Sequence, residues 1–416
     1  MADFNSPVTE LLGRSEDAFI GRRAVFAGDI ADASILHLAK LCQEALVLCD
    51  NFTAAQQMAA LLGQELEPRL NSKAQYKHIS VIYTALQLFG APECDLICLL
   101  LNKSKPINQS LLAALTPALV PDGLILAAGA NEAGGRSADG YLKSHGMLFK
   151  KDSARKCTLW QLNFDKNSVF AYPPHSLVLS AGERERFNAA LNAGDAQAVK
   201  TALKSFALDA DAGAGTAAIP PRSVLKVDTS AGELQVLQDV HVFSPGRVDE
   251  GTAQLISCLN DFARSPALDL CCGSGIVGLQ LCRQGINTAF ADLSAAALFL
   301  STLNLCLNGL IDQCLGVSAS DMLADLDKLK QAAAPQGFGL IAVNPPFHQG
   351  VKQKSTPARA LFASVKDYLQ PAGVLLCVGN AFLGYDELMA QDLPHVSVKA
   401  RTTRFVTTAG SLQPLP

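Results

Sequence analysis

Apolar runs rich in Val, Ile, Leu and Ala recur along the chain, separated by stretches with helical periodicity. Several runs are continuous rather than alternating, such as CDLICLLL from residue 94 and FGLIAV from residue 338. A strand that is apolar throughout is buried on both faces, as in parallel sheets covered by helices. The pattern therefore predicts an α/β fold, with mostly parallel sheets wound on both sides by helices.

The same order of elements occurs twice. Residues 46–62 and 289–305 each consist of a short strand, an acidic residue and a helix. Further along, residues 111–134 and 361–384 each consist of a helix, a Pro-x-Gly turn and a buried strand. We therefore predict two doubly wound domains in tandem, related by internal duplication.

A segment rich in Ala and Gly, DADAGAGTAAIPPRS, lies between the two halves at residues 209–223 and is typical of a linker. We therefore expect a first domain at 1–208 and a second at 224–416. At 416 residues the chain is long enough for each domain to bury its own core.

A candidate cofactor loop opens the second domain. ALDLCCGSGIVGLQLCRQG, residues 267–285, predicts a strand, a glycine turn and a helix. Gly273, Gly275 and Gly278 have the spacing G-x-G-x-x-G, which permits a tight turn and close approach of a ligand to the backbone. Asp292 ends the next strand, where a carboxylate can accept hydrogen bonds from both ribose hydroxyls. These features predict a cofactor that contains adenosine.

The glycine spacing alone also suits NAD, whose pyrophosphate binds at a helix N-terminus. Asp269, just before the turn, favours S-adenosylmethionine instead, because a carboxylate there repels a pyrophosphate and suits the amino group of a methionine moiety. After the following strand, Asp321 is placed to meet the adenine amino group, with Met322 against the ring. The alternative is that Asp321 caps a helix.

The first domain differs at the equivalent place. It has AVFAGDI at residues 24–30, with Gly28 as the only glycine of the turn. We therefore expect the first domain to lack the cofactor loop and to bind no cofactor.

A buried strand of the second domain ends in Asn344-Pro345-Pro346-Phe347-His348. The prolines fix the backbone and remove two N–H donors, so nearby carbonyl groups can accept hydrogen bonds from another molecule. The Asn344 side-chain oxygen and the Pro345 carbonyl can then face one amino group, while Phe347 offers a flat apolar surface. His348 either orders the turn or contacts a substrate.

This combination suits methylation of an exocyclic nucleobase amine, a poor nucleophile whose lone pair is delocalised into the ring. Two aligned acceptors stabilise the positive charge that develops on the nitrogen, so preorganised electrostatics replace a strong base. The target base would leave its stack and rest on Phe347. A proline-rich loop with an Asn cap is the plainer interpretation, but the turn follows a cofactor loop in the expected strand order.

These motifs resemble those of the bacterial ribosomal RNA small-subunit guanine-N2 methyltransferases. Asn344 to His348 and DLCCGSGIVG carry the resemblance, together with VFSPGRVDEGT at 242–252, VGNAFLGY at 378–385 and TTRFVTTA at 402–409. In the first half, NKSKP and GANEAGGRSA are similar to the family's first-domain signatures. The resemblance thus covers most of the chain.

The resemblance implies two tandem Rossmann-like class I methyltransferase domains, and transfer of a methyl group from S-adenosylmethionine to N2 of a guanine in 16S ribosomal RNA. The first domain would assist RNA recognition or support folding. By this resemblance, the guanine is held by Asn344, Pro345 and Phe347. The cofactor is held by Asp269, Gly273, Asp292 and Asp321. Phe243 lies near the cofactor or substrate in this family, though packing explains that residue equally well.

Other functions stay open at this point. The large-subunit guanine-N2 family, which acts on 23S ribosomal RNA, shares the NPPFHQ turn, but NAFLGY favours the small subunit. Methylation of adenine N6 or of a protein glutamine uses the same kind of turn, although Phe347 disfavours glutamine, for which tyrosine is expected. A non-catalytic RNA-binding ribosome-assembly factor would not need both Asp269 and Asp292.

Composition and charge narrow the class of protein. Hydrophobic residues make up 49% and charged residues 17%, as in a compact enzyme, and the net charge of −4 provides no general attraction to RNA. An RNA site must therefore be a local patch. Candidate basic residues are Lys103, Lys105, Arg136, Lys352, Lys354 and Arg359.

No signal peptide and no apolar run of membrane-spanning length is evident, so we expect a cytoplasmic protein with no membrane partner. The twelve cysteines are scattered, without zinc-ligand spacing. We expect buried free thiols, no metal site and a monomer.

Overall fold

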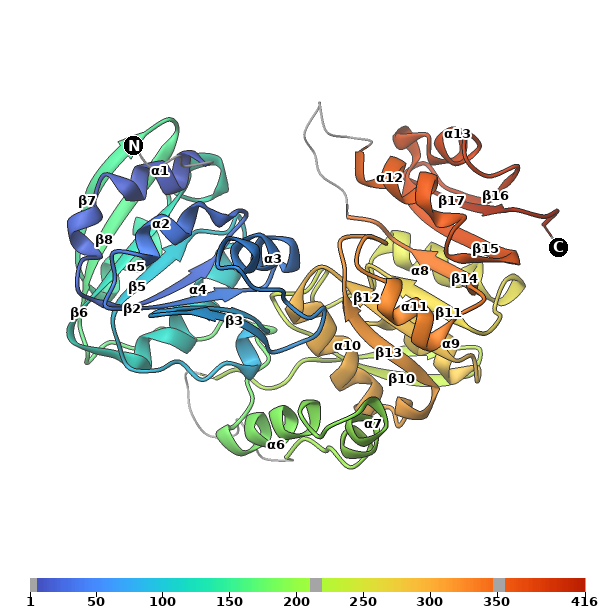
Figure 1. Cartoon of the computed structure of the whole chain (residues 1–416), viewed down its shortest axis with the longest axis horizontal. Helices are drawn as coiled ribbons and strands as arrows, with labels where there is room; N and C mark the ends of the chain where they lie inside the picture. The colour runs from blue at the N-terminus through green and yellow to red at the C-terminus, as the bar shows by residue number, and fades with distance from the viewer. Residues whose placement is uncertain (1–5, 210–218, 347–355, 416) are drawn as a thin grey trace. The chain divides into compact units, whose positions relative to one another are not determined.

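The computed structural model describes residues 6–209, 219–346 and 356–415. The chain forms two compact units, each with its own sheet (Figure 1). The first unit comprises the chain up to Arg184 together with Ala210–Arg222, and the second comprises Glu185–Asp209 and Ser223 to the C-terminus. Residues 185–209, expected in the first domain, therefore cluster with the second unit.

The second unit is built on a seven-stranded sheet. In sheet order the strands are β13 (Cys314–Ala319), β12 (Thr288–Asp292), β11 (Ala267–Leu270), β14 (Phe338–Val343), β15 (Leu369–Asn380), β17 (Phe405–Ser411) and β16 (His395–Arg401). The first five are parallel, and β17 runs antiparallel to both of its neighbours. The predicted continuous apolar strands are confirmed, since all residues of β11 and β14 are buried.

Helices and one hairpin complete this unit. The helices are α7 (Ala196–Lys204), α8 (Glu250–Ser257), α9 (Ile276–Arg283), α10 (Ala295–Leu307), α11 (Asp327–Ala333), α12 (Thr356–Val365) and α13 (Tyr385–Met389). Strands β9 (Val224–Thr229) and β10 (Gly232–Leu237) form the hairpin. Helix α6 (Ala181–Leu191) spans the boundary between the units.

The first unit has an eight-stranded sheet. In sheet order its strands are β3 (Ser72–Tyr76), β4 (Ile79–Tyr83), β2 (Glu44–Cys49), β1 (Arg23–Gly28), β5 (Cys94–Leu100), β6 (Leu119–Ala130), β8 (Cys157–Phe164) and β7 (Gly146–Ala154). Its helices are α1 (Pro7–Gly13), α2 (Leu36–Ala39), α3 (Phe52–Leu61), α4 (Lys105–Leu115) and α5 (Asp139–Leu142).

The duplication predicted from the sequence is visible in the topology. Without β3, the first sheet has the same succession as the second: five parallel strands, one antiparallel strand, and a last strand that is parallel to the first five. The long strands β6 and β15 have identical patterns of buried and exposed residues along twelve positions. Both units are therefore doubly wound, Rossmann-like α/β folds, as predicted.

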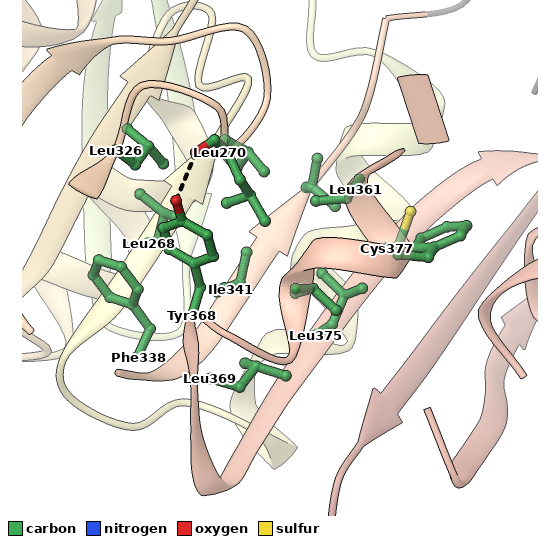
Figure 2. Packing of buried hydrophobic residues seen from close by; sticks show 14 of the residues in the cluster. Leu268, Leu270, Leu326, Phe338, Ile341, Leu361, Tyr368, Leu369, Leu375 and Cys377 are labelled. Atoms are coloured by element: carbon green, nitrogen blue, oxygen red, sulfur yellow. Dashed lines mark hydrogen bonds between the residues drawn. The ribbon is translucent and has the colours of Figure 1, made fainter. Parts of the chain in front are cut away.

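The alternation of side chains along β11 separates the core from the site. Leu268 and Leu270 point into a buried cluster with Ile341, Leu375 and, from α12, Leu361 (Figure 2). The hydroxyl of Tyr368 at the edge of this cluster donates to the Leu323 carbonyl at 2.9 Å, so its polar end is satisfied. Because side chains alternate along a strand, Asp269, between the two leucines, points to the opposite face of the sheet, where α9 packs.

A buried ion pair fastens the end of the linker segment to the first unit. Ser180 and Glu183 form a capping box at the start of α6, with the Glu183 N–H donating to Ser180 Oγ at 3.1 Å and the Ser180 N–H to Glu183 Oε2 at 2.8 Å. The fully buried Glu183 carboxylate also accepts from Arg222 Nη2 at 2.6 and 2.7 Å.

We predict that Glu183→Ala lowers the free energy of unfolding of the first unit by about 3–5 kcal/mol, because the Arg222 guanidinium loses its buried partner. Trp160, the single tryptophan of the chain, lies in β8, so its fluorescence in urea reports this unit. Glu93→Ala is the matched control, since Glu93 pairs with Arg23 but is 69% exposed, and should cost only about 0–1 kcal/mol. Equal losses in both variants would contradict the prediction.

Candidate functional site

The candidate site lies where β11 and β14 end side by side. These strands pair in parallel, with Leu270 opposite Val343, so the loop after β11 and the turn after β14 leave the sheet together. The chain continues from β11 to β12 on one side and reaches β14 on the other, which makes this the switch point of the sheet. Ligands of doubly wound folds bind outside the strand ends at such a point.

The three predicted glycines shape the loop between β11 and α9 in different ways. Gly273 and Gly275 have φ of +54° and +82°, a backbone conformation that glycine adopts without strain. A Cβ on Gly278 would lie 2.2 Å from Phe290 Cε1, so only glycine lets α9 pack this closely on β12. Cys271, which also has a positive φ of 58°, begins the turn.

Two predicted carboxylates hold this loop. Asp292 accepts from the Gly273 N–H through Oδ2 and from the Ser294 N–H through Oδ1, both at 2.9 Å. Asp269 is 2% exposed and accepts from the Gly278 N–H at 2.8 Å. Burial raises the pKa of Asp269 well above its usual range, the Gly278 N–H opposes that rise, and the nearby Asp292 adds to it. A cationic amino group is the ligand that would favour the charged form of Asp269, so the residues fit a methionine moiety.

Asp321 lies at the end of the next strand. The Ser320 N–H donates to the Asp292 carbonyl at 3.0 Å, which joins the ends of β12 and β13. The Asp321 side chain is exposed, and Met322, buried with φ of +52°, lies with its sulfur 3.7 Å from Cys271 Sγ. Helix α11 begins only at Asp327, so Asp321 is not its cap.

The turn after β14 contains a contact that the sequence analysis missed. Asn344 is half-buried and donates from Nδ2 to Thr252 Oγ1 at 2.9 Å. Thr252 lies in the first turn of α8, where the Asp249 carboxylate accepts from the Gly251 and Thr252 N–H groups at 2.9 and 3.3 Å. This contact engages the nitrogen of the Asn344 amide and joins the turn after β14 to α8. The sequence alone indicates Asp249 as a cap before an apolar helix. It does not indicate that Thr252 of this helix contacts Asn344.

The remaining predicted positions are placed as follows. Pro345 is buried, while Phe347 and His348 lie outside the described residues, as do Lys352 and Lys354. Phe243 is 73% exposed and follows Val242, whose Cγ1 is 3.8 Å from the position of a Cβ on Gly273. In the first unit, the candidate basic residues Lys103, Lys105 and Arg136 are exposed. In the second unit, Arg359 donates to Gln391 Oε1 at 3.2 Å.

At the equivalent place in the first unit, the backbone after β1 is hydrogen-bonded to the end of β5. After β1, the Asp29 N–H donates to the Leu100 carbonyl at 2.8 Å, and a Cβ on Gly28 would lie 1.9 Å from that oxygen. After β5, Asn102 Oδ1 accepts from the Ser104 N–H at 2.8 Å within its own turn. The chain after β1 therefore stays bonded to the end of β5, whereas β11 is followed by the glycine loop.

From the sequence we expected neither a metal site nor a membrane-spanning segment. Within the described ranges no three His, Cys, Asp or Glu side chains lie together as metal ligands, and all twelve cysteines are free thiols. No helix in the described part of the chain has both the length and the apolar character needed to cross a bilayer.

Comparison with known proteins agrees with the fold and the glycine loop. The family model of the methyltransferase small domain matches residues 233–409, and that of its N-terminal domain matches residues 9–173. The second unit is therefore a methyltransferase domain.

Similar proteins span the whole chain. The ribosomal RNA small subunit methyltransferase C of Aeromonas hydrophila is 29% identical over 96% of each chain, and that of Yersinia pseudotuberculosis is 28% identical over 96% of this chain and 94% of its own. The solved T. thermophilus 16S rRNA N2 methyltransferase, in complex with AdoMet and guanosine, has a TM-score of 0.68 at 18% identity, over 98% of this chain and 92% of that one. The two family models together cover most of the chain, which therefore belongs to the methyltransferase small-domain family. These relatives confirm the predicted resemblance to the ribosomal RNA small-subunit methyltransferases.

We predict that Gly278→Ala weakens the affinity for S-adenosylmethionine by about tenfold or more. The added methyl group meets the Phe290 ring at 2.2 Å and pushes α9 away from the loop, an overpacking that costs about 1–3 kcal/mol. Titration calorimetry gives the affinity. Adding Phe290→Leu should restore part of it, and Gly140→Ala, where a Cβ meets nothing within 4 Å, should leave it unchanged. Wild-type affinity in Gly278→Ala would show that the loop does not depend on this packing.

Proposed function

We propose that the protein transfers a methyl group from S-adenosylmethionine to the exocyclic N2 amine of a guanine in 16S ribosomal RNA. The observation that carries the proposal is the Asn344 amide, held by Thr252 with its oxygen directed away from that contact, beside the glycine loop. The names of the full-length relatives, and the solved neighbour that contains AdoMet and guanosine, support this choice.

The cofactor would be held by the residues predicted from the sequence. Asp292 would accept from the ribose hydroxyls, since each carboxylate oxygen can accept more than one hydrogen bond. Asp269 would stabilise the amino group of the methionine moiety, and the exposed carboxylate of Asp321 would accept from the adenine amino group. Gly273 and Gly275 would let the ligand approach the loop backbone. When bound, the cofactor supplies a methyl group activated by a sulfonium.

The turn after β14 would activate the guanine. The N2 lone pair is delocalised into the ring, so the nitrogen gains positive charge as the new N–C bond forms and the C–S bond breaks. Asn344 Oδ1 and the Pro345 carbonyl would accept the two N2 hydrogens and stabilise that charge before the proton is lost to solvent. We retain the proposal that Phe347 stacks on the base.

The proposed substrate is the 16S RNA, either free or in the small ribosomal subunit. We further propose that the enzyme acts as a monomer in the cytoplasm, without a metal. The basic residues Lys103, Lys105, Arg136 and Arg359 are candidates for phosphate contacts that position RNA without reading its sequence.

We predict that the protein labels small subunits or 16S RNA from methyl-labelled S-adenosylmethionine, and that Asn344→Ala lowers kcat about a hundred- to a thousandfold while its affinity for the cofactor stays unchanged. Digestion to nucleosides should show the label in N2-methylguanosine. Large subunits and DNA are the parallel substrates. Label confined to either would reject the proposal, and loss of cofactor affinity in Asn344→Ala would make that residue structural.

Thr252 gives a sharper test of the mechanism. We predict that Thr252→Val lowers kcat by about tenfold to a hundredfold, because the Asn344 amide can then rotate away from the working orientation. Thr252→Ser keeps the hydroxyl and should retain most of the activity. Both variants should bind S-adenosylmethionine as the wild type does. Equal activity of the valine and serine variants would show that the contact does not orient the amide.

A further inference from the structure

A polar and apolar patch on the first unit has no role in its core or in the site described above. Strand β7 is the last strand of the sheet, and among the residues that the structure describes it pairs only with β8. Met147 and Phe149 of β7 are 64% and 47% exposed. Across the ladder, Asn163 is paired with Met147 and Gln161 with Phe149, so the four side chains share one face of the hairpin. We call these four residues the hairpin face.

The charge around the hairpin face is unlike that of the whole chain. Residues 143–156 contain five Lys or Arg and one Asp, in a protein with a net charge of −4. Two of the charges are paired with α1, since Arg155 bonds to Glu10 and Asp152 lies 3.5 Å from Arg14. Lys150 and Lys151, directly after Phe149, are exposed and form no ion pair within the described residues.

These features favour one class of binding partner for the hairpin face. Lysines on an edge strand oppose pairing with a strand of another protein, and two apolar side chains are too few to anchor a membrane. Lys150 is paired with Trp160 on the other face of the ladder, and Lys151 lies at the register shift that follows, so both lysines are beside the hairpin face rather than on it. An exposed ring and a thioether next to these lysines suit unstacked bases and the phosphates that join them. The Gln161 Nε2 donates to Asn163 Oδ1 at 3.2 Å, which orients two amides on the same face for contacts with base edges.

We propose that the hairpin face binds a single-stranded segment of the substrate RNA. The proposal rests on the proposed function for the identity of that RNA. Bases would stack on Phe149 and Met147, the amides of Gln161 and Asn163 would meet base edges, and Lys150 and Lys151 would contact phosphates. Such contacts bind ground state and transition state alike, so their removal raises KM without lowering kcat.

The test compares two double variants with a control. Met147→Ala with Phe149→Ala removes the stacking surface, and Lys150→Glu with Lys151→Glu reverses the charge. Ile20→Ala removes an apolar side chain of the same unit that is also 64% exposed. The Trp160 fluorescence midpoint in urea shows whether the first unit stays folded. Filter binding of 16S RNA at several salt concentrations, together with kcat and KM for methyl transfer, provides the readout.

We expect each double variant to bind 16S RNA about tenfold more weakly or worse, with kcat and cofactor affinity unchanged. The charge-reversed variant should also show a shallower dependence of affinity on salt, by about one unit for each phosphate that the protein no longer neutralises. The Ile20→Ala control should match the wild type.

Three results would overturn the proposal. The first is wild-type RNA affinity in both double variants, and the second is an equal loss in Ile20→Ala. The third is normal affinity for free RNA with weaker binding to assembled subunits, which would assign the face to a ribosomal protein. Failure of the proposed function is recognised separately, because the wild-type enzyme would then label no 16S RNA.

Discussion

The parallel pairing of β11 with β14 is the constraint on which the candidate site depends. It places Leu270 opposite Val343, and so brings the glycine loop and Asn344 to the same edge from positions far apart in the chain. Both strands are buried on both faces, which fixes their register, because a shift by one residue would exchange the two faces. In β11 such a shift would turn Asp269 into the apolar cluster around Leu268 and Leu270.

The two units show that a shared fold does not determine which loops follow its strands. Their sheets share one succession of strands, yet the ends of β1 and β5 are joined by a backbone hydrogen bond from Asp29 to Leu100, while the corresponding end of β11 leads into a loop held by carboxylates. The difference arises from a few residues after one strand, whereas the strands themselves kept the burial pattern seen in β6 and β15. In such a duplicated protein, function depends on the loops that follow the strands rather than on the shared sheet.

The sequence predicted what local signals determine. The buried strands, the glycine loop and the placement of Asp292 follow from periodicity and spacing, and all appear in the structure. The contact between Thr252 and Asn344 could not be predicted, because it joins residues from two elements whose packing is set by the whole sheet. The capping box of Ser180 and Glu183 was readable, but the partner Arg222 was not. The domain boundary shows the same limit. Composition indicated a linker at 209–223, but only tertiary packing shows that residues 185–209 cluster with the second unit.

The Asn344–Thr252 contact also explains why an amide suits this position better than a carboxylate. An amide has a donor and an acceptor on one rigid plane, so a hydrogen bond at Nδ2 fixes where Oδ1 points. Aspartate has no donor, so Thr252 would have to donate its own hydroxyl hydrogen. Either carboxylate oxygen could accept that hydrogen, so the contact would not fix which oxygen faces a ligand. Glutamine has the same group on a longer stem with more rotamers to restrict. Under the proposed function, an amide fixed at its nitrogen would be a neutral acceptor aligned before the substrate arrives, and a poor nucleophile such as a guanine amine would need alignment more than basicity.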